Sequence, residues 1–76
     1  MLVELNVLRR DDPRTADLLE RFTGELGWRE PLDITADNRI EIFFVGSDTD
    51  EDRARVKAAL DAAGGDWPSY FTFGAR

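Results

Sequence analysis

The chain switches between two hydrophobic spacings, and the order in which they occur constrains the fold more than any other feature. A period of two, typical of strands, occurs in four segments: residues 2–9, 28–35, 39–47 and 66–74. The third segment (RIEIFFVGS) is apolar on both alternating sides, which indicates a strand in the middle of a sheet. Pro31 and Pro68 lie in the second and fourth segments. Because proline cannot donate a ladder hydrogen bond, these two strands are predicted at the edges.

Helical spacing occurs after the first and third of these segments. From Thr15 to Leu26, apolar residues recur every three or four positions. Asp12 is predicted to cap this helix and Pro13 to be its first residue, because the missing N–H of proline has no partner to lose there. Gly27 is predicted to end the helix in a left-handed conformation, with Trp28 folding back over the last turn.

The second helix is predicted to begin within the acidic stretch DTDED, residues 48–52. Thr49 followed by Asp52 resembles a capping box, and acids in a first turn interact favourably with the helix dipole. The same stretch imitates the opening of a calcium-binding loop. However, Arg53 stands where that loop needs glycine, and Ala59 stands where it needs a bidentate glutamate. The acids are therefore interpreted as a helix start, and no metal site is predicted.

The order strand, helix, strand, strand, helix, strand predicts an α+β domain of the ferredoxin-like βαββαβ type. In this fold a four-stranded antiparallel sheet carries two helices on one face and leaves the other face open. The first and third strands are expected at the centre. The turn ADN, residues 36–38, joins the second and third strands, since Asp and Asn tolerate positive φ. The whole chain, residues 1–76, is expected to form one domain.

The composition excludes several chemistries. The net charge of −6, from 16 acidic and 10 basic residues, repels phosphate backbones and anionic membranes, so neither nucleic acid nor membrane is an expected partner. The chain has no cysteine and no histidine, which removes thiolate chemistry and the commonest general base. No segment approaches the roughly 18 apolar residues of a membrane span, and no secretory signal is recognised. A cytoplasmic location is expected, and no cofactor is predicted.

The open face of the predicted sheet is the first candidate site. Phe43, Val45 and Tyr70 make this face more apolar than a wetted sheet requires, which favours self-association or a protein partner. Glu4 and Glu41 would set specificity by charge. RNA-recognition modules use the same face, but they carry basic residues around their aromatics. Here the flanking residues are acidic, and nucleic acid is not expected.

Arg9, Arg10 and Arg14 form the second candidate site, because they surround a predicted helix N-terminus where an anion could bind. Asp11 and Asp12 lie in the same loop and would neutralise these arginines. Local salt bridges and a small anionic ligand therefore remain alternatives.

The first strand, the following DDP, the stretch LLERFTGELG from Leu18 to Gly27 and IEIFFVGS from Ile40 to Ser47 resemble ACT regulatory domains. The resemblance implies a regulatory module that binds amino acids and similar ligands at a dimer interface. The glycine that follows Asp-x-Pro in that family would fall near Arg14 or Thr15, and neither is glycine. The chain therefore departs from the family where the backbone approaches a ligand.

An enzymatic role rests on Glu4 and Glu41, which are expected to face each other across neighbouring strands. Their like charges would favour protonation of one of them, and Tyr70 lies on the same face. No catalytic residue is assigned, since the face is open to water. The sequence thus predicts a non-catalytic binding module that acts through its open face, most simply as a homodimer. An ACT-like sensor, an acidic inhibitor of a basic partner and a cofactor-free enzyme of small molecules remain alternatives.

Overall fold

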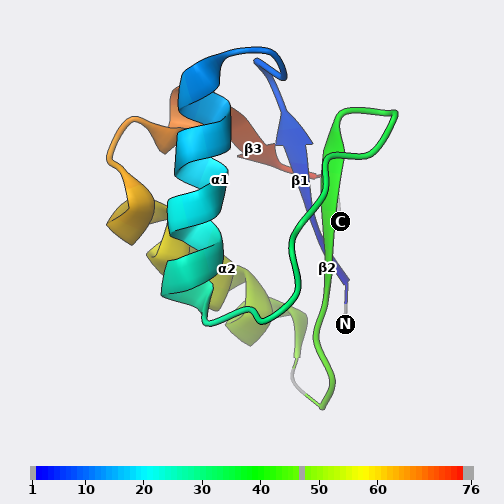
Figure 1. Cartoon of the computed structure of the whole chain (residues 1–76). Coiled ribbons are helices and arrows are strands. Elements are labelled where there is room, and N and C mark those ends of the chain that lie inside the picture. The colour runs from blue at the N-terminus through cyan, green and yellow to red at the C-terminus, as the bar shows by residue number, and fades with distance from the viewer. Residues whose placement is uncertain (1, 47, 75–76) are drawn as a thin grey trace.

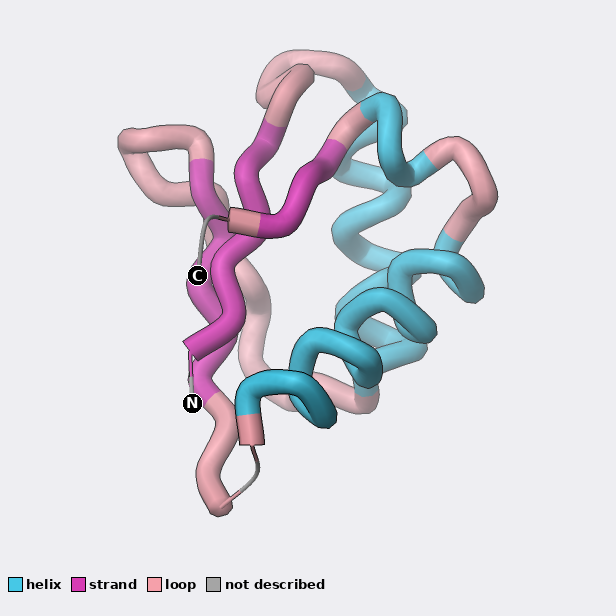
Figure 2. The backbone as a smooth tube through the Cα atoms, turned by 180° about the vertical axis from the view of Figure 1, so that it is seen from behind, coloured by secondary structure: helices cyan, strands magenta, loops and turns pink. Residues whose placement is uncertain are grey.

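The computed structural model describes residues 2–46 and 48–74 as two layers, a sheet and a pair of helices (Figure 1). The elements are β1 (Leu2–Val7), α1 (Pro13–Leu26), β2 (Arg39–Phe43), α2 (Thr49–Ala63), the 3-10 helix η1 (Trp67–Ser69) and β3 (Phe71–Phe73). The three strands form one antiparallel sheet in the order β2-β1-β3. Figure 2 shows both helices on the same side of this sheet. The α+β class and the one-sided arrangement of the helices are therefore confirmed.

The sheet has three strands in the described part of the chain and not the predicted four. Residues 28–35 do not form a strand, so β2 lies at an edge and not in the middle of the sheet. The first hydrogen bond of the predicted hairpin between residues 28–35 and β2 is nevertheless present. Thr35 N–H donates to the carbonyl O of Arg39 at 2.8 Å, and Asn38 takes the positive φ of 58° expected in this turn.

Two conflicts between this segment and β2 oppose the continuation of the hairpin. The next rung beyond Thr35 and Arg39 would place Asp33 directly opposite Glu41, and like charges in opposite positions destabilise a ladder. The rung after that would use Pro31, which has no N–H to donate. The segment instead turns its apolar side chains inward, and Leu32 and Ile34 pack half-buried against the core.

The last predicted strand, residues 66–74, is also shorter than expected. Trp67–Ser69 forms η1, and only Phe71–Phe73 pairs with β1. Pro68 lies inside η1 and not at the entry of an edge strand, because its fixed φ suits the first turn of a helix. The buried Trp67 anchors this turn to α2, since its indole Nε1–H donates to Asp61 Oδ1 at 2.7 Å.

The ends of α1 match the prediction. Asp12 is the N-cap and its carboxylate accepts the N–H of Arg14 at 2.9 Å, while Pro13 opens the helix. Gly27 follows the last turn with a φ of 72°. Trp28 N–H donates back to the carbonyl O of Thr23 at 3.1 Å, which closes the helix as expected.

The start of α2 lies where the acids predicted it, but the cap is shifted by one residue. Asp48 and not Thr49 is the N-cap, and its carboxylate accepts the N–H of Glu51 at 2.8 Å. The pair Asp48 and Glu51 therefore has the spacing of a capping box, and Asp52 takes no part in it. With this helix register, Asp52 faces the core together with Val56 and Leu60.

The core lies between the sheet and the helices. Side chains from each layer are fully enclosed, among them Leu5, Leu18, Phe22, Ile40 and Leu60, each 0% exposed. The residues of β1 alternate between half-buried and buried, in agreement with the period of two in the sequence. In the described residues, no helix combines the length and the apolar character needed to cross a membrane.

Gly64 lies where the end of α2 approaches the start of α1. A Cβ atom there would lie 2.6 Å from Arg14 Nη2, 2.8 Å from Leu18 Cδ2 and 3.0 Å from Asp66 Oδ1. Gly64→Ala should lower the free energy of unfolding by about 1–3 kcal/mol, measured by urea denaturation, because the buried Leu18 and the ion pair of Arg14 with Asp66 must move. Gly65→Ala is the control, since a Cβ there meets nothing within 4 Å. Equal effects of the two substitutions would contradict the close approach.

Candidate interface on the open sheet face

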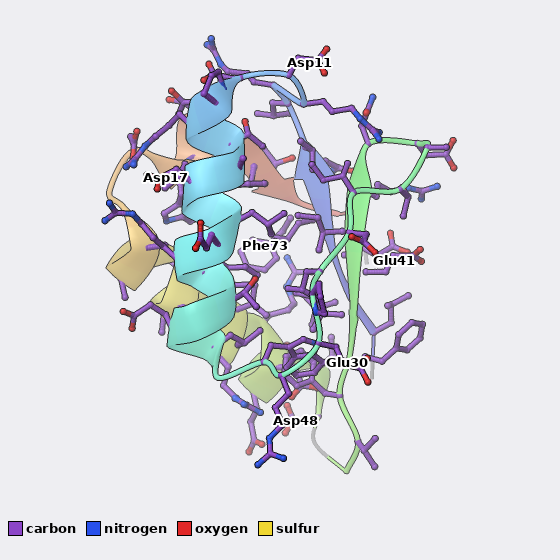
Figure 3. The ribbon with its side chains drawn as sticks, in the orientation of Figure 1. Asp11, Asp17, Glu30, Glu41, Asp48 and Phe73 are labelled. Carbon is purple, nitrogen blue, oxygen red and sulfur yellow. The ribbon has the colours of Figure 1, made fainter. Side chains whose placement is uncertain are left out.

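The face of the sheet that the helices leave uncovered has an apolar end and a polar end. The pairing of β1 with β2 sets Leu2 opposite Phe43, Glu4 opposite Glu41 and Asn6 opposite Arg39. All six side chains share this face, because the intervening residues of both strands point into the core. Figure 3 shows Glu41 on the side of β2 that faces away from the helices.

The apolar end is formed around the last residues of β2 and the loop that follows. Phe43 is 65% exposed and Val45 is 99% exposed, while Leu2 beside them is half-buried. The next aromatic, Phe44, points the other way and is buried, with the ring of Trp28 packed edge-on against it at 5.2 Å between centroids. Phe43 therefore lies bare on a face that no helix covers, and Val45 lies bare in the loop that follows β2.

Tyr70 lies apart from these two residues. Its carbonyl O accepts the N–H of Leu8 at 2.8 Å, which places it at the far end of β1 from Leu2. A strand rises about 3.4 Å per residue, so the separation along β1 is about 20 Å. The Tyr70 ring is half-buried beneath the guanidinium of Arg9, 5.6 Å from the ring centroid. The structure thus does not bring Tyr70 together with Phe43 and Val45.

The two predicted acids of this face have different surroundings. They lie directly opposite each other, as expected. Glu4 is only 15% exposed, and its Oε2 lies 3.8 Å from Nη1 of Arg39. Glu41 is exposed and forms no ion pair in the described structure. The free negative charge that this face presents therefore belongs to Glu41.

The three arginines of the second candidate site have three separate sets of partners. Arg9 Nε donates to the carbonyl O of Ser69 at 3.1 Å. Arg10 Nη1 donates to the carbonyl O of Thr35 at 2.6 Å and to Oδ1 of Asn38 at 3.0 Å. The structure does not bring these guanidinium groups together around one point, and the small-anion site stays a prediction.

Arg14, the third of these arginines, joins α1 to the loop after α2. Its Nε and Nη2 donate to Asp66 at 3.0 and 2.8 Å, and its Nη1 donates to Asp17 at 2.6 Å. The hydrogen bonds that Arg14 donates to the Asp66 carboxylate hold the pKa of Asp66 below its usual value, and the same bonds raise the pKa of Arg14. Likewise, hydrogen bonds from Lys57 and Trp67 lower the pKa of Asp61. These contacts stabilise the helix layer and its connection to β3.

Two features of the structure were missed from the sequence. The first is Asp52, which is 0% exposed and whose carboxylate oxygens have no hydrogen-bond partner among the described residues. Its position four residues before Val56 was a signal for burial, since residues four apart share a helix face. The second is a groove between β2 and the segment after α1. The charges and the proline that keep these segments apart are visible in the sequence.

Comparison of the chain with models of protein families, with curated proteins and with solved structures finds no match. Within the described residues, no group of three or more acidic side chains is arranged to hold a metal ion. The candidate site therefore rests on the geometry of the sheet.

Proposed function

We propose that this domain is a small binding module that self-associates through the open face of its sheet. The observation that carries the proposal is the exposure of Phe43, 65%, on a face without helices, together with the exposure of Val45, 99%, in the loop that follows β2. Neighbouring exposed apolar side chains on a small protein often mark an interface, because their removal from water favours association. The proposed contact centre is Phe43, Val45 and the adjacent Leu2.

The charges of the same face support a second copy of the chain as the partner. A two-fold interface brings one patch against itself, so a self-complementary patch needs both signs of charge. Arg39 and Glu41 lie two positions apart on β2 and point to the same side. In a two-fold dimer, Arg39 of one copy would lie near Glu41 of the other, and this pairing would give the interface its register.

We also interpret the sheet as a ferredoxin-like arrangement that lacks one edge strand. β1 lies between β2 and β3 and is antiparallel to both, as the first strand of that fold is. Each helix crosses over on the same face. Residues 28–35 occupy the position between α1 and β2 where the absent strand would be. This interpretation supports the proposal, because ferredoxin-like domains often associate through their sheets.

Sedimentation velocity over a wide range of protein concentrations tests the proposal. The wild type should form a dimer, and Phe43→Glu should weaken the dimer at least about tenfold, because a charge would be buried without a partner. Ala62→Glu is the matched control, since it adds the same charge at an exposed position of α2. It should leave the dimer unchanged. A wild type that stays monomeric, or a Phe43→Glu variant that still dimerises, would contradict the proposal.

A further inference from the structure

The edge of β2 offers unpaired backbone groups. Val7 N–H donates to the carbonyl O of Asn38 at 2.7 Å, which marks these two residues as a hydrogen-bonded pair. Because such pairs alternate along an antiparallel ladder, the two isoleucines of β2 direct their N–H and C=O groups at β1. Glu41 and Phe43 direct theirs outward, and no described residue bonds to those groups.

A groove of about 400 Å³ lies between this edge and the segment that follows α1. Its apolar lining comes from Trp28, Pro31 and Leu32 on the segment and from Phe43 on β2. Figure 1 shows the segment running alongside β2 before the turn at residues 36–38. An extended chain added to β2 would lie about 4.8 Å from it, in the direction of this groove.

All charged side chains that line the groove are acidic. Glu30, Asp33 and Glu41 line it, and no lysine or arginine does. None of the three forms an ion pair in the described structure. Glu30 and Glu41 are labelled in Figure 3, on the segment and on β2 respectively. A strand bound in this groove would therefore contact apolar side chains and carboxylates that have no ion-pair partner among the described residues.

We infer that this groove binds an extended basic peptide segment, which adds to the sheet as a fourth strand along the outer edge of β2. The backbone of the peptide completes the hydrogen bonds of Glu41 and Phe43. Its alternate side chains are basic and pair with the carboxylates, and those between them are apolar and contact Trp28 and Leu32. The site uses the outer backbone edge of β2, but it shares the side chains of Glu41 and Phe43 with the open face. Peptide binding is therefore measured at protein concentrations where the chain is monomeric.

The probe is a short fluorescein-labelled peptide in which lysine and valine alternate, measured by fluorescence anisotropy. Wild type should bind it with an affinity that falls as salt rises, and should not bind the glutamate-valine counterpart. The double substitution Asp33→Lys with Glu41→Lys should weaken binding at least about tenfold. Glu51→Lys, at an exposed position on α2 outside this groove, should leave the affinity unchanged.

A change in the backbone of the peptide distinguishes strand addition from simple charge attraction. A peptide methylated on alternate backbone nitrogens keeps every charge but cannot donate to β2, and it should bind at least about tenfold more weakly. In amide hydrogen exchange, the N–H groups of Glu41 and Phe43 should exchange fast in the free protein and slowly with the peptide bound. Equal binding of the methylated peptide, or slow exchange at both positions in the free protein, would overturn the inference.

Discussion

Phe22→Ala is expected to lower the free energy of unfolding by about 3–5 kcal/mol, whereas Phe43→Ala should change it by no more than about 0.5 kcal/mol. The chemical change is the same at both positions. Phe22 is 0% exposed between the helix layer and the sheet, and its removal leaves a cavity. Phe43 is 65% exposed on the uncovered face. Urea denaturation followed by circular dichroism measures both effects.

The size of the first effect matters for a chain of 76 residues. At the usual 0.05–0.15 kcal/mol per residue, the total stability is about 4–11 kcal/mol, so Phe22→Ala should remove a large part of it. The measurement should be made at protein concentrations where the chain is monomeric, because association through Phe43 would add to the apparent stability. A loss at Phe43 as large as that at Phe22 would show that Phe43 belongs to the core. Phe43 would then not lie on an uncovered face of the sheet, and the proposed interface would be contradicted.

Asp52→Ala is expected to raise the free energy of unfolding by about 1–2 kcal/mol. A buried polar group without a hydrogen-bond partner costs about 1–3 kcal/mol, and more when it is charged. Neither oxygen of Asp52 has a partner among the described residues. The substitution also removes a favourable interaction with the dipole of α2, about 0.3–1 kcal/mol, and this reduces the net gain. Chemical denaturation measures the difference.

Asp50→Ala is the matched control, because Asp50 lies in the same first turn of α2 but is exposed. It should lower the free energy of unfolding by about 0.3–1 kcal/mol, since only the interaction with the helix dipole is lost. The two substitutions are therefore expected to have opposite signs. If Asp52→Ala destabilises the protein as Asp50→Ala does, the Asp52 carboxylate has partners in solution that compensate its burial.

The predictions that succeeded depend on contacts between residues close in the chain. The cap at Asp12, the proline that opens α1 and the left-handed Gly27 are each set by neighbours within one helical turn. The alternating burial of β1 is likewise a local pattern. The exposure of Phe43 followed from its position between Ile42 and Phe44, which face the core.

The predictions that failed depend on how separate segments meet. Residues 28–35 have the composition of an edge strand, but a strand exists only if its rungs can form. Asp33 opposite Glu41 and the missing N–H of Pro31 oppose those rungs, and this conflict arises only when the segment is placed beside β2. The prediction of the N-cap of α2 was wrong for a related reason. Asp48 and Thr49 are both good N-caps, and only packing of the helix on the sheet decides which register is used.

The sequence by itself determined which segments become helices, where α1 begins and ends, and which side of each strand avoids water, because these properties follow from local hydrogen bonds and periodicity. The tertiary structure decided that β2 has a bare edge beside an acidic groove, that Tyr70 lies far from Phe43, that the arginines have separate partners and that Asp52 is enclosed. Each of these depends on distances between residues far apart in the chain, and those distances are set only when the helices pack on the sheet.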